Sequence, residues 1–243
     1  MSNVRIMSYE LFLPFPSKLR ITNLDSLNNN QFMTTLNAKN LTLCEVHHLL
    51  KINKLPNGLF TPLLSLEPLT EFEQQELTQI RNDFDSYLTE GRVIEGLTKA
   101  LTTFPLMRLA GFYRSPLKIS LEQDITQIII EDEDTSITGR LDILAVNKMQ
   151  PTTTDTFLWV LVIESKNSSI APSAGLPQLL TYTYKSLESQ KSVWGLATNG
   201  ELYQFVYIQQ ANPLTYQLMP ILSLMDAEPS VELLQVLKAI CKL

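Results

Sequence analysis

The chain has 243 residues, 44% of them hydrophobic and 18% charged, and a formal net charge of −6. This length and composition are typical of a folded protein with its own core, and the acidic balance disfavours loose, non-specific attraction to phosphate backbones. Cys44 and Cys241 form no C-x-x-C pair, and no segment carries the run of about 18 apolar residues that a membrane span needs, so we expect a cytoplasmic protein without a cysteine zinc site.

Residues 1–66 show weak periodicity and several prolines, and we interpret them as an N-terminal extension of unknown role. We assign residues 67–243 to the main domain. Apolar residues near its start recur with helical spacing and predict a helix that Gly91 interrupts. The predicted apolar face of this helix carries Phe72, Leu77, Ile80, Phe84 and Leu88.

A second helix is predicted over residues 92–104, ended by Pro105. The short runs that follow are rich in β-branched and aromatic residues. They predict a meander of adjacent strands, with an exposed turn at the acidic residues 131–134. The strands are expected at residues 116–121, 125–130, 137–146 and 157–165.

A third helix is predicted over residues 174–188. Two strands are expected next, at residues 192–198 and 201–208, joined by a turn at Asn199-Gly200. An amphipathic helix over residues 231–243 follows. This alternation of helices and strands predicts an α/β fold in which helices cover a mixed sheet.

Three charged residues interrupt apolar strand patterns. Asp142 lies inside the run RLDILAV, and Glu164 and Lys166 stand at the end of FLWVLVIES. Residues two apart on a strand share a face, so Glu164 and Lys166 point the same way. If the two strands pair, Asp142 and Glu164 converge on one hard cation such as Mg²⁺, with Lys166 placed to orient a water or to stabilise charge on a phosphate. A solvated strand edge or a structural ion pair is the alternative interpretation.

The segments GRLDILAV, LVIESKN and PQLLTY occur in this order and resemble the PD-(D/E)XK nuclease superfamily, most closely the N-terminal nuclease domain of type I restriction endonuclease R subunits. The resemblance covers residues 87–208 and departs from the family at Leu141, where the Pro that names the superfamily would stand. It implies a restriction-endonuclease-like mixed β-sheet flanked by helices, with an αβββαβ core. The catalytic residues that it implies are Asp142, Glu164, Lys166 and Gln178. The implied metal ligands are Asp142 and Glu164, for Mg²⁺ or for Mn²⁺ in its place.

The same resemblance places an acidic metal ligand on the helix before the strands. Glu95 is the candidate and Glu90 its rival, and an exposed helix position is an equally good interpretation of Glu95. Gln178 would contact the DNA backbone or position Lys166, although a buried glutamine that caps a helix is the alternative. We expect Arg140 to point to the face of its strand opposite Asp142, and we assign it a structural role.

The function implied by the resemblance is that of a Mg²⁺-dependent deoxyribonuclease, an endonuclease and hydrolase that cleaves phosphodiester bonds of DNA in a restriction-modification setting. The sequence contains no G-x-x-x-x-G-K-[ST] phosphate loop, so the ATPase motor of a complete restriction subunit is absent from it. A homodimer, or separate specificity and motor subunits, would supply the further parts. The alternative is a non-catalytic DNA- or protein-binding module on a nuclease-like fold, in a defence or repair system.

Overall fold

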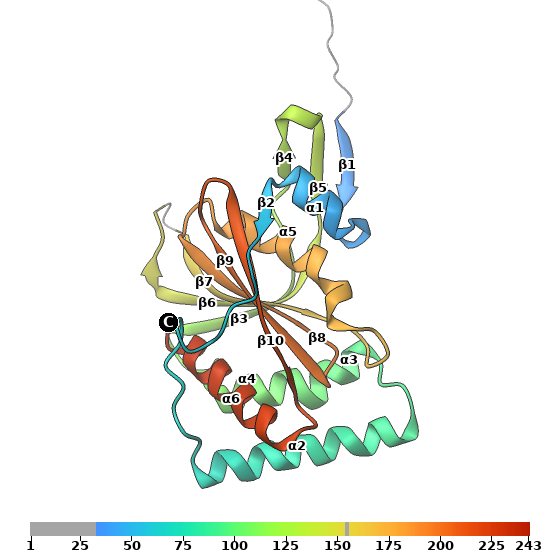
Figure 1. Cartoon of the computed structure of the whole chain (residues 1–243), viewed down its shortest axis with the longest axis vertical. Coiled ribbons are helices and arrows are strands. Elements are labelled where there is room, and N and C mark those ends of the chain that lie inside the picture. Colours follow the sequence, from blue (N-terminus) through green and yellow to red (C-terminus); the bar gives the residue numbers. More distant parts are fainter. Residues whose placement is uncertain (1–32, 154–155) are drawn as a thin grey trace, which may run out of the picture. The chain divides into compact units, whose positions relative to one another are not determined.

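Two β-sheets organise residues 33–153 and 156–243, which the computed structural model describes (Figure 1). In the larger sheet the order is β2-β10-β9-β8-β7-β6-β3, and in the smaller it is β1-β5-β4. The strands of the larger sheet are β2 (Ile52–Lys54), β3 (Leu117–Asp124), β6 (Arg140–Pro151), β7 (Phe157–Ser165), β8 (Ser192–Thr198), β9 (Leu202–Gln209) and β10 (Leu214–Ser223). Those of the smaller sheet are β1 (Thr34–Asn37), β4 (Ile128–Ile130) and β5 (Thr135–Thr138).

Six α-helices and four short helical segments of other types accompany these strands in the described residues. The α-helices are α1 (Leu43–Leu49), α2 (Glu71–Glu90), α3 (Glu95–Thr98), α4 (Phe104–Ala110), α5 (Leu176–Ser186) and α6 (Ala227–Cys241). The short segments are the 3₁₀ helices η1 (Ala38–Asn40), η3 (Glu131–Glu133) and η4 (Pro172–Gly175), and the π-helix η2 (Lys99–Thr103).

The larger sheet mixes both strand directions. β6 pairs antiparallel with β3 and with β7, and β7 pairs parallel with β8. The chain therefore runs through α4, β3, β6, β7, α5 and β8 in the αβββαβ order. The predicted mixed sheet flanked by helices is confirmed.

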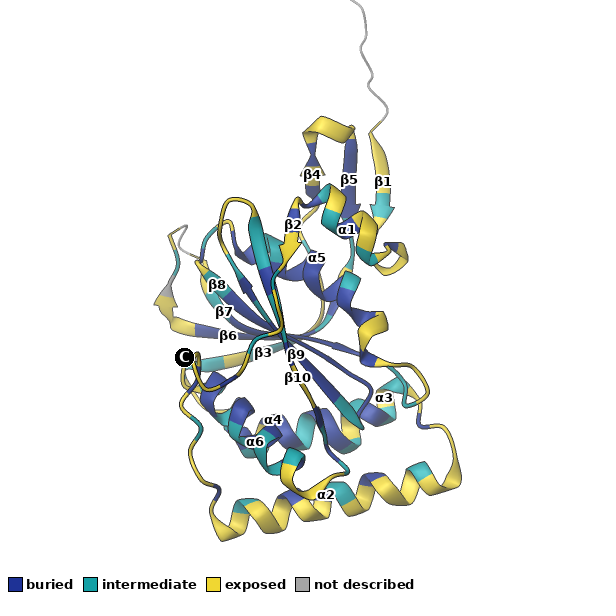
Figure 2. Ribbon diagram, in the orientation of Figure 1, coloured by how far each residue is buried: buried dark blue, intermediate teal, exposed yellow. Residues whose placement is uncertain are grey.

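Alternating side chains of the central strands build two cores, one on each face of the larger sheet. Ile143 and Ile163 belong to the core that also contains the buried residues of α2, α4 and α6. Leu144 and Val162 belong to the core that contains the buried residues of α5. Figure 2 shows the central strands buried and the outer surface of α2 exposed. Both faces of the sheet are thus covered, and the strand ends remain to form a site.

The predicted helix before Gly91 is α2, and Gly91 follows its last residue with a φ of 134°. Leu77, Ile80 and Phe84 are buried on its inner face, as the periodicity predicted. Phe72 is an exception, since 63% of it is exposed near the start of the helix. The predicted apolar face was one residue too long at this end because the first turn of α2 extends beyond the core.

Pro105 does not end a helix, so the prediction over residues 92–104 was wrong at its C-terminal end. α3, η2 and α4 follow one another without a break from Glu95 to Ala110. Pro105 is the second residue of α4, directly after the π-helical turn. A proline inside a helix removes one backbone hydrogen bond, and a π-turn is a place where the regular hydrogen-bond ladder is already interrupted.

The predicted meander is also corrected. β3, β6 and β7 are neighbours, but β4 leaves the larger sheet and pairs with β5 in the smaller one. The acidic turn predicted at residues 131–134 is confirmed as the β4–β5 connection, and the Asn199-Gly200 turn as the β8–β9 connection. β10 was missed, because Pro213 and Pro220 mask its pattern of alternating residues.

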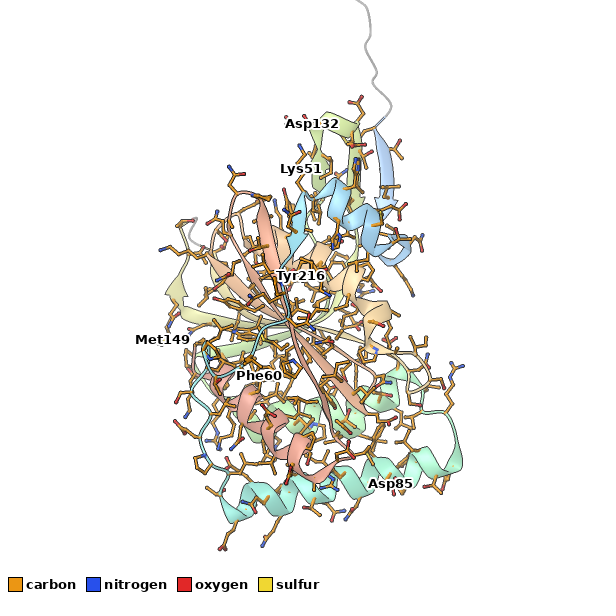
Figure 3. The ribbon with its side chains drawn as sticks, in the orientation of Figure 1. Lys51, Phe60, Asp85, Asp132, Met149 and Tyr216 are labelled. Carbon is orange, nitrogen blue, oxygen red and sulfur yellow. The ribbon has the colours of Figure 1, made fainter. Side chains whose placement is uncertain are left out.

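Residues 33–66 supply β1, α1 and β2, which the sequence did not predict. β1 pairs parallel with β5, and β2 pairs parallel with β10. Lys51, between α1 and β2, forms an ion pair of 2.8 Å with Asp132 in the β4–β5 turn (Figure 3). Residues 1–32 and 154–155 lie outside the described residues. The domain boundary between residues 66 and 67 stays a prediction.

The longest helix in the described part of the chain is α2, and its outward surface is mostly polar. Neither it nor any other helix of that part combines the length and the apolar character that crossing a membrane requires.

Candidate active site

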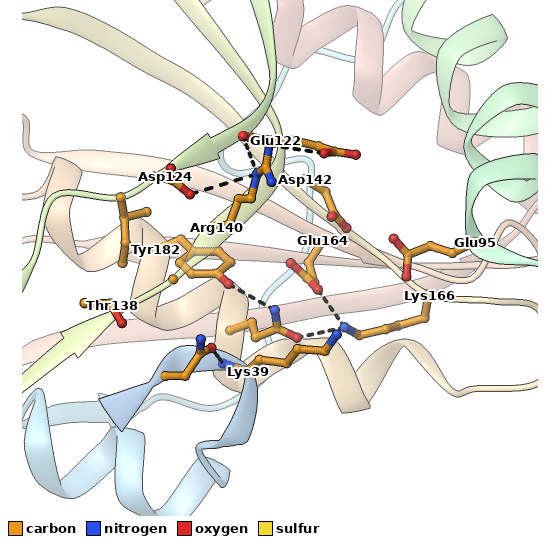
Figure 4. Close-up of a pocket in the computed structure, with 14 residues that line it drawn as sticks. Lys39, Glu95, Glu122, Asp124, Thr138, Arg140, Asp142, Glu164, Lys166 and Tyr182 are labelled. Carbon is orange, nitrogen blue, oxygen red and sulfur yellow. Dashed lines mark hydrogen bonds and ion pairs between the residues drawn. The ribbon is translucent and has the colours of Figure 1, made fainter. Parts of the chain in front are cut away.

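A pocket of about 520 Å³ opens at the ends of β6 and β7 (Figure 4). Its wall contains every residue that the sequence analysis proposed for the site: Glu95, Asp142, Glu164, Lys166 and Gln178. These residues come from α3, β6, β7, the loop after β7, and α5. Glu90, the rival of Glu95, is the last residue of α2 and does not line this pocket.

Asp142 and Glu164 meet because β6 and β7 pair in a fixed register. Ile143 lies opposite Ile163, so Asp142 and Glu164 are the next residues on adjoining strands. The Asp142 Oδ2 atom accepts a hydrogen bond of 2.8 Å from the backbone N–H of Ser165. This bond joins the carboxylate of one strand to the backbone of the other and holds the two acids side by side.

Glu164 is a buried acid, with only 2% of the residue exposed. Burial, followed by the nearby Asp142 carboxylate, raises its pKa to about 7, although Lys166 acts in the opposite direction. Oε1 accepts a hydrogen bond of 2.6 Å from Lys166, whereas Oε2 is buried without a hydrogen-bond partner among the described residues. A buried carboxylate oxygen without a partner, next to a second carboxylate, costs folding free energy unless a cation binds there.

Lys166 is held by a chain of hydrogen bonds. Its Nζ donates to Glu164 Oε1 and, over 2.8 Å, to Gln178 Oε1. The Gln178 amide Nε2 then donates to the hydroxyl of buried Tyr182 over 3.0 Å. Gln178 therefore positions Lys166, and the alternative of a helix cap is set aside because Gly175 precedes α5 and no side chain caps it.

Glu95 reaches the pocket from α3 and is bound to a residue that the sequence analysis missed. Lys99 Nζ lies 2.9 Å from Glu95 Oε1 and 3.4 Å from Asp142 Oδ1. Burial by itself would lower the pKa of Lys99, but the hydrogen bond with Glu95 and the charge of Asp142 outweigh it and raise the pKa. The spacing of four residues between Glu95 and Lys99 was the available signal.

Two further cations line the pocket. Arg140 stands two residues before Asp142 and so shares its face of β6, and it forms an ion pair of 3.3 Å with Glu122. Lys39 comes from η1, in the segment that was interpreted as an extension, and points toward Lys166 in Figure 4. The expectation that Arg140 points away from Asp142 was wrong, because residues two apart on a strand share a face. Nothing in the sequence connects Lys39 with the pocket.

The donor set matches a hard divalent cation in part. Asp142 and Glu164 provide adjacent carboxylate oxygens, and Oε2 of Glu164 is free to bind. Mg²⁺ commonly takes one or two carboxylates and keeps several waters, so two acids are enough. Within residues 33–153 and 156–243, no group of three or more His, Cys, Asp and Glu side chains is arranged to hold a metal ion. Glu95 thus does not complete a preformed carboxylate triad.

Comparisons with known proteins add little to this geometry. No family model matches the sequence, and no curated protein does. One solved structure to which the chain is similar is a fragment described as an HsdR subunit of a type I restriction enzyme from Vibrio vulnificus YJ016. The TM-score is 0.35 at 17% identity, and the alignment covers 52% of this chain and 23% of that one.

Proposed function

We propose that the protein is a Mg²⁺-dependent nuclease that hydrolyses phosphodiester bonds in DNA. One observation carries the proposal: Asp142 and Glu164 stand side by side at the ends of two paired strands, with the Lys166 ammonium hydrogen-bonded to Glu164 in an open pocket. Carboxylates, an amine and solvent access are the groups that metal-assisted hydrolysis of a phosphodiester needs.

Each residue of the pocket has a separate task in this proposal. Asp142 and Glu164 would hold the metal ion through oxygen ligands. The ion, when bound, supplies a Lewis acid for the phosphate and a water of lowered pKa. Lys166 directs its ammonium at the attacking water or at the charge that grows on the phosphate. Gln178 and Tyr182 keep the Lys166 side chain in that position through their hydrogen bonds.

Substrate binding has to overcome the acidic balance of the chain, so local cations are required. Lys39 is exposed at the pocket wall and forms no ion pair within the described residues. An unpaired ammonium at this place suits a phosphate of the DNA backbone next to the one that is cleaved. Arg140 is less free for this task because Glu122 holds it.

The test is DNA cleavage by the purified full chain. Plasmid and single-stranded DNA are incubated in Mg²⁺, in Mn²⁺ and in chelator with the wild type, with Lys166→Met and with Lys191→Met. Lys191 precedes β8 at the strand end opposite the pocket, so its variant is a matched control. We expect metal-dependent cutting that Lys166→Met lowers by about 10²-fold or more and that Lys191→Met leaves unchanged.

Circular dichroism of both variants establishes that they are folded. Equal cutting by the wild type and Lys166→Met, or cutting that persists in chelator, contradicts the proposal. A complete lack of cutting on every DNA, together with DNA binding, favours the second candidate, a non-catalytic binding module. Two observations favour the binding module. Asp142 and Glu164 are paired with Lys99 and Lys166, and the described residues contain no preformed group of three side chains for a metal ion.

A further inference from the structure

Lys99 lies between two of the five carboxylates that line the pocket. Its ammonium contacts Glu95 at 2.9 Å and Asp142 at 3.4 Å, and only 12% of its side chain is exposed. Asp142 is the acid that the proposed function assigns to the metal. The lysine therefore supplies a positive charge beside Asp142, one of the two residues that would hold the divalent cation.

The local backbone aims Lys99 at this place. Lys99 is the first residue of the π-helical segment η2, directly after α3 carries Glu95 to the pocket. A π-turn inserts one residue into a helix and changes the direction of the side chains around it, and such turns occur frequently at functional sites. Buried Thr98 precedes the segment and buried Thr102 lies within it, and the Thr102 hydroxyl donates to the Thr98 carbonyl.

This lysine offsets part of the negative charge of the pocket. Glu164 is paired with Lys166, and Asp142 and Glu95 are paired with Lys99. A divalent ion added to this arrangement would bring surplus positive charge next to two ammonium groups. Mg²⁺ binds carboxylate oxygens at about 2.0–2.1 Å. The Lys99 ammonium already contacts one carboxylate oxygen of Asp142, so an ion that binds this oxygen competes with the ammonium.

We propose that Lys99 occupies the cation position beside Asp142 in the metal-free protein and leaves Asp142 when a divalent metal ion binds, so that it sets the metal affinity of the pocket. The inference rests on the proposed function for Asp142 as a metal ligand. As a consequence, the site would not bind metal at low metal concentrations, and Glu95 would become available as a ligand only after Lys99 has moved.

The first test measures Mn²⁺ binding to the full chain without DNA, by the electron paramagnetic resonance signal of free Mn²⁺. Lys99→Met removes the charge and keeps most of the volume, and we expect Mn²⁺ to bind about 10-fold more tightly, which corresponds to about 1.4 kcal/mol. Lys99→Arg keeps the charge, and we expect it to retain the weaker affinity of the wild type. Lys191→Met, remote from the pocket, is the control for a change in net charge.

The second test uses the wild type and does not depend on the folding of a variant. Lysines are acetylated with and without Mg²⁺, and the modified residues are quantified by mass spectrometry. We expect Mg²⁺ to accelerate the labelling of Lys99 several-fold relative to that of Lys191, because a lysine that leaves its carboxylates becomes accessible. A rate for Lys99 that Mg²⁺ leaves unchanged overturns the proposal.

Unchanged or weaker Mn²⁺ binding by folded Lys99→Met also overturns it, as does a lack of Mn²⁺ binding in all proteins. The proposed nuclease function fails in a different way. If Lys99→Met binds Mn²⁺ more tightly while the wild type cuts no DNA under any condition, the inference about Lys99 holds and the nuclease proposal is rejected.

Discussion

At the scale of one residue, Glu164 is subject to two conditions that both disfavour its charged form. It is buried on a central strand, where a charged carboxylate is unfavourable, and it lies beside Asp142, which adds a second negative charge. Lys166 offsets only part of this cost, since the pKa of Glu164 is still raised to about 7. A group in this state exchanges its proton near neutral pH, and an incoming cation would displace that proton.

The stability of the metal-free protein should therefore depend on the protonation of Glu164. Between the ordinary glutamate pKa of 4.5 and about 7, the folded chain keeps a proton that the unfolded chain releases. The stabilising contribution of Glu164 to the free energy of unfolding is then fully present below pH 4.5 and is lost as the pH rises through about 7. Glu164→Gln cannot ionise, so we expect the variant to gain stability relative to the wild type over this range.

The measurement is urea unfolding in chelator at a series of pH values, with Glu76→Gln as an exposed control. Each pKa unit that Glu164 is displaced corresponds to about 1.4 kcal/mol. Parallel pH profiles for the wild type and Glu164→Gln would show that Glu164 does not titrate differently in the folded state.

The β8–β9 turn illustrates how one element positions others. Gly200 in this turn has a φ of 89°, and a Cβ atom there would lie 2.6 Å from Cγ2 of Thr98 and 2.7 Å from Cζ of Phe84. The turn thus packs directly against α2 and α3. Because α3 also carries Glu95, the turn contacts the helix that reaches the pocket.

We predict that Gly200→Ala lowers the free energy of unfolding by about 2 kcal/mol or more, because the backbone strain and the steric clash add up. Gly96→Ala is the matched control. A Cβ atom at Gly96, in α3, meets no atom within 4 Å, and alanine favours a helix by up to about 1 kcal/mol. Urea denaturation compares the two variants. A Gly200→Ala protein as stable as Gly96→Ala would show that the contact of the turn with Phe84 is loose.

Gly139 plays a similar role between the two sheets. It separates β5 from β6, and a Cβ atom there would lie 2.7 Å from the Tyr182 ring and 3.1 Å from Ala38. The predicted single strand over residues 137–146 breaks at this glycine, so that β5 leaves for the smaller sheet. The break lets Tyr182 approach the backbone and support Gln178 from behind.

On the scale of the whole molecule, residues before α2 pack against the larger sheet and extend it. Phe60 is 2% exposed and belongs to the core on the side of α2, α4 and α6, where its ring lies 6.5 Å from that of Trp194 and 5.6 Å from that of Phe205. β2 extends the sheet beyond β10. A chain that begins at residue 67 would lack both contributions.

Phe60→Ala is accordingly expected to cost about 3–5 kcal/mol of stability, through lost burial and the cavity that remains. Leu59→Ala, at a neighbouring position that is 62% exposed, should change the stability by no more than about 0.5 kcal/mol. Tryptophan fluorescence during urea unfolding reports both, because Trp194 lies against Phe60. Equal effects of the two substitutions would mean that this segment is not part of the core.

The sequence by itself determined the features that depend on neighbouring residues. The strand period places Glu164 and Lys166 on one face, and the helical period identifies the buried face of α2. The ordered motifs around Asp142 and Gln178 were identified through their resemblance to a known nuclease superfamily. The pairing of β6 with β7, which the sequence required but did not establish, is present and brings Asp142 to Glu164.

Only the tertiary structure decided which distant segments share the pocket. It placed Glu95 and Lys39, but not Glu90, in the pocket wall and brought Lys99 to Asp142. The physical reason is that side-chain direction within an element follows from backbone geometry, whereas contacts between elements depend on how all of them bury their apolar faces together. A local pattern contains no information about that collective packing, and so the lysine between the acids could be recognised only in the folded chain.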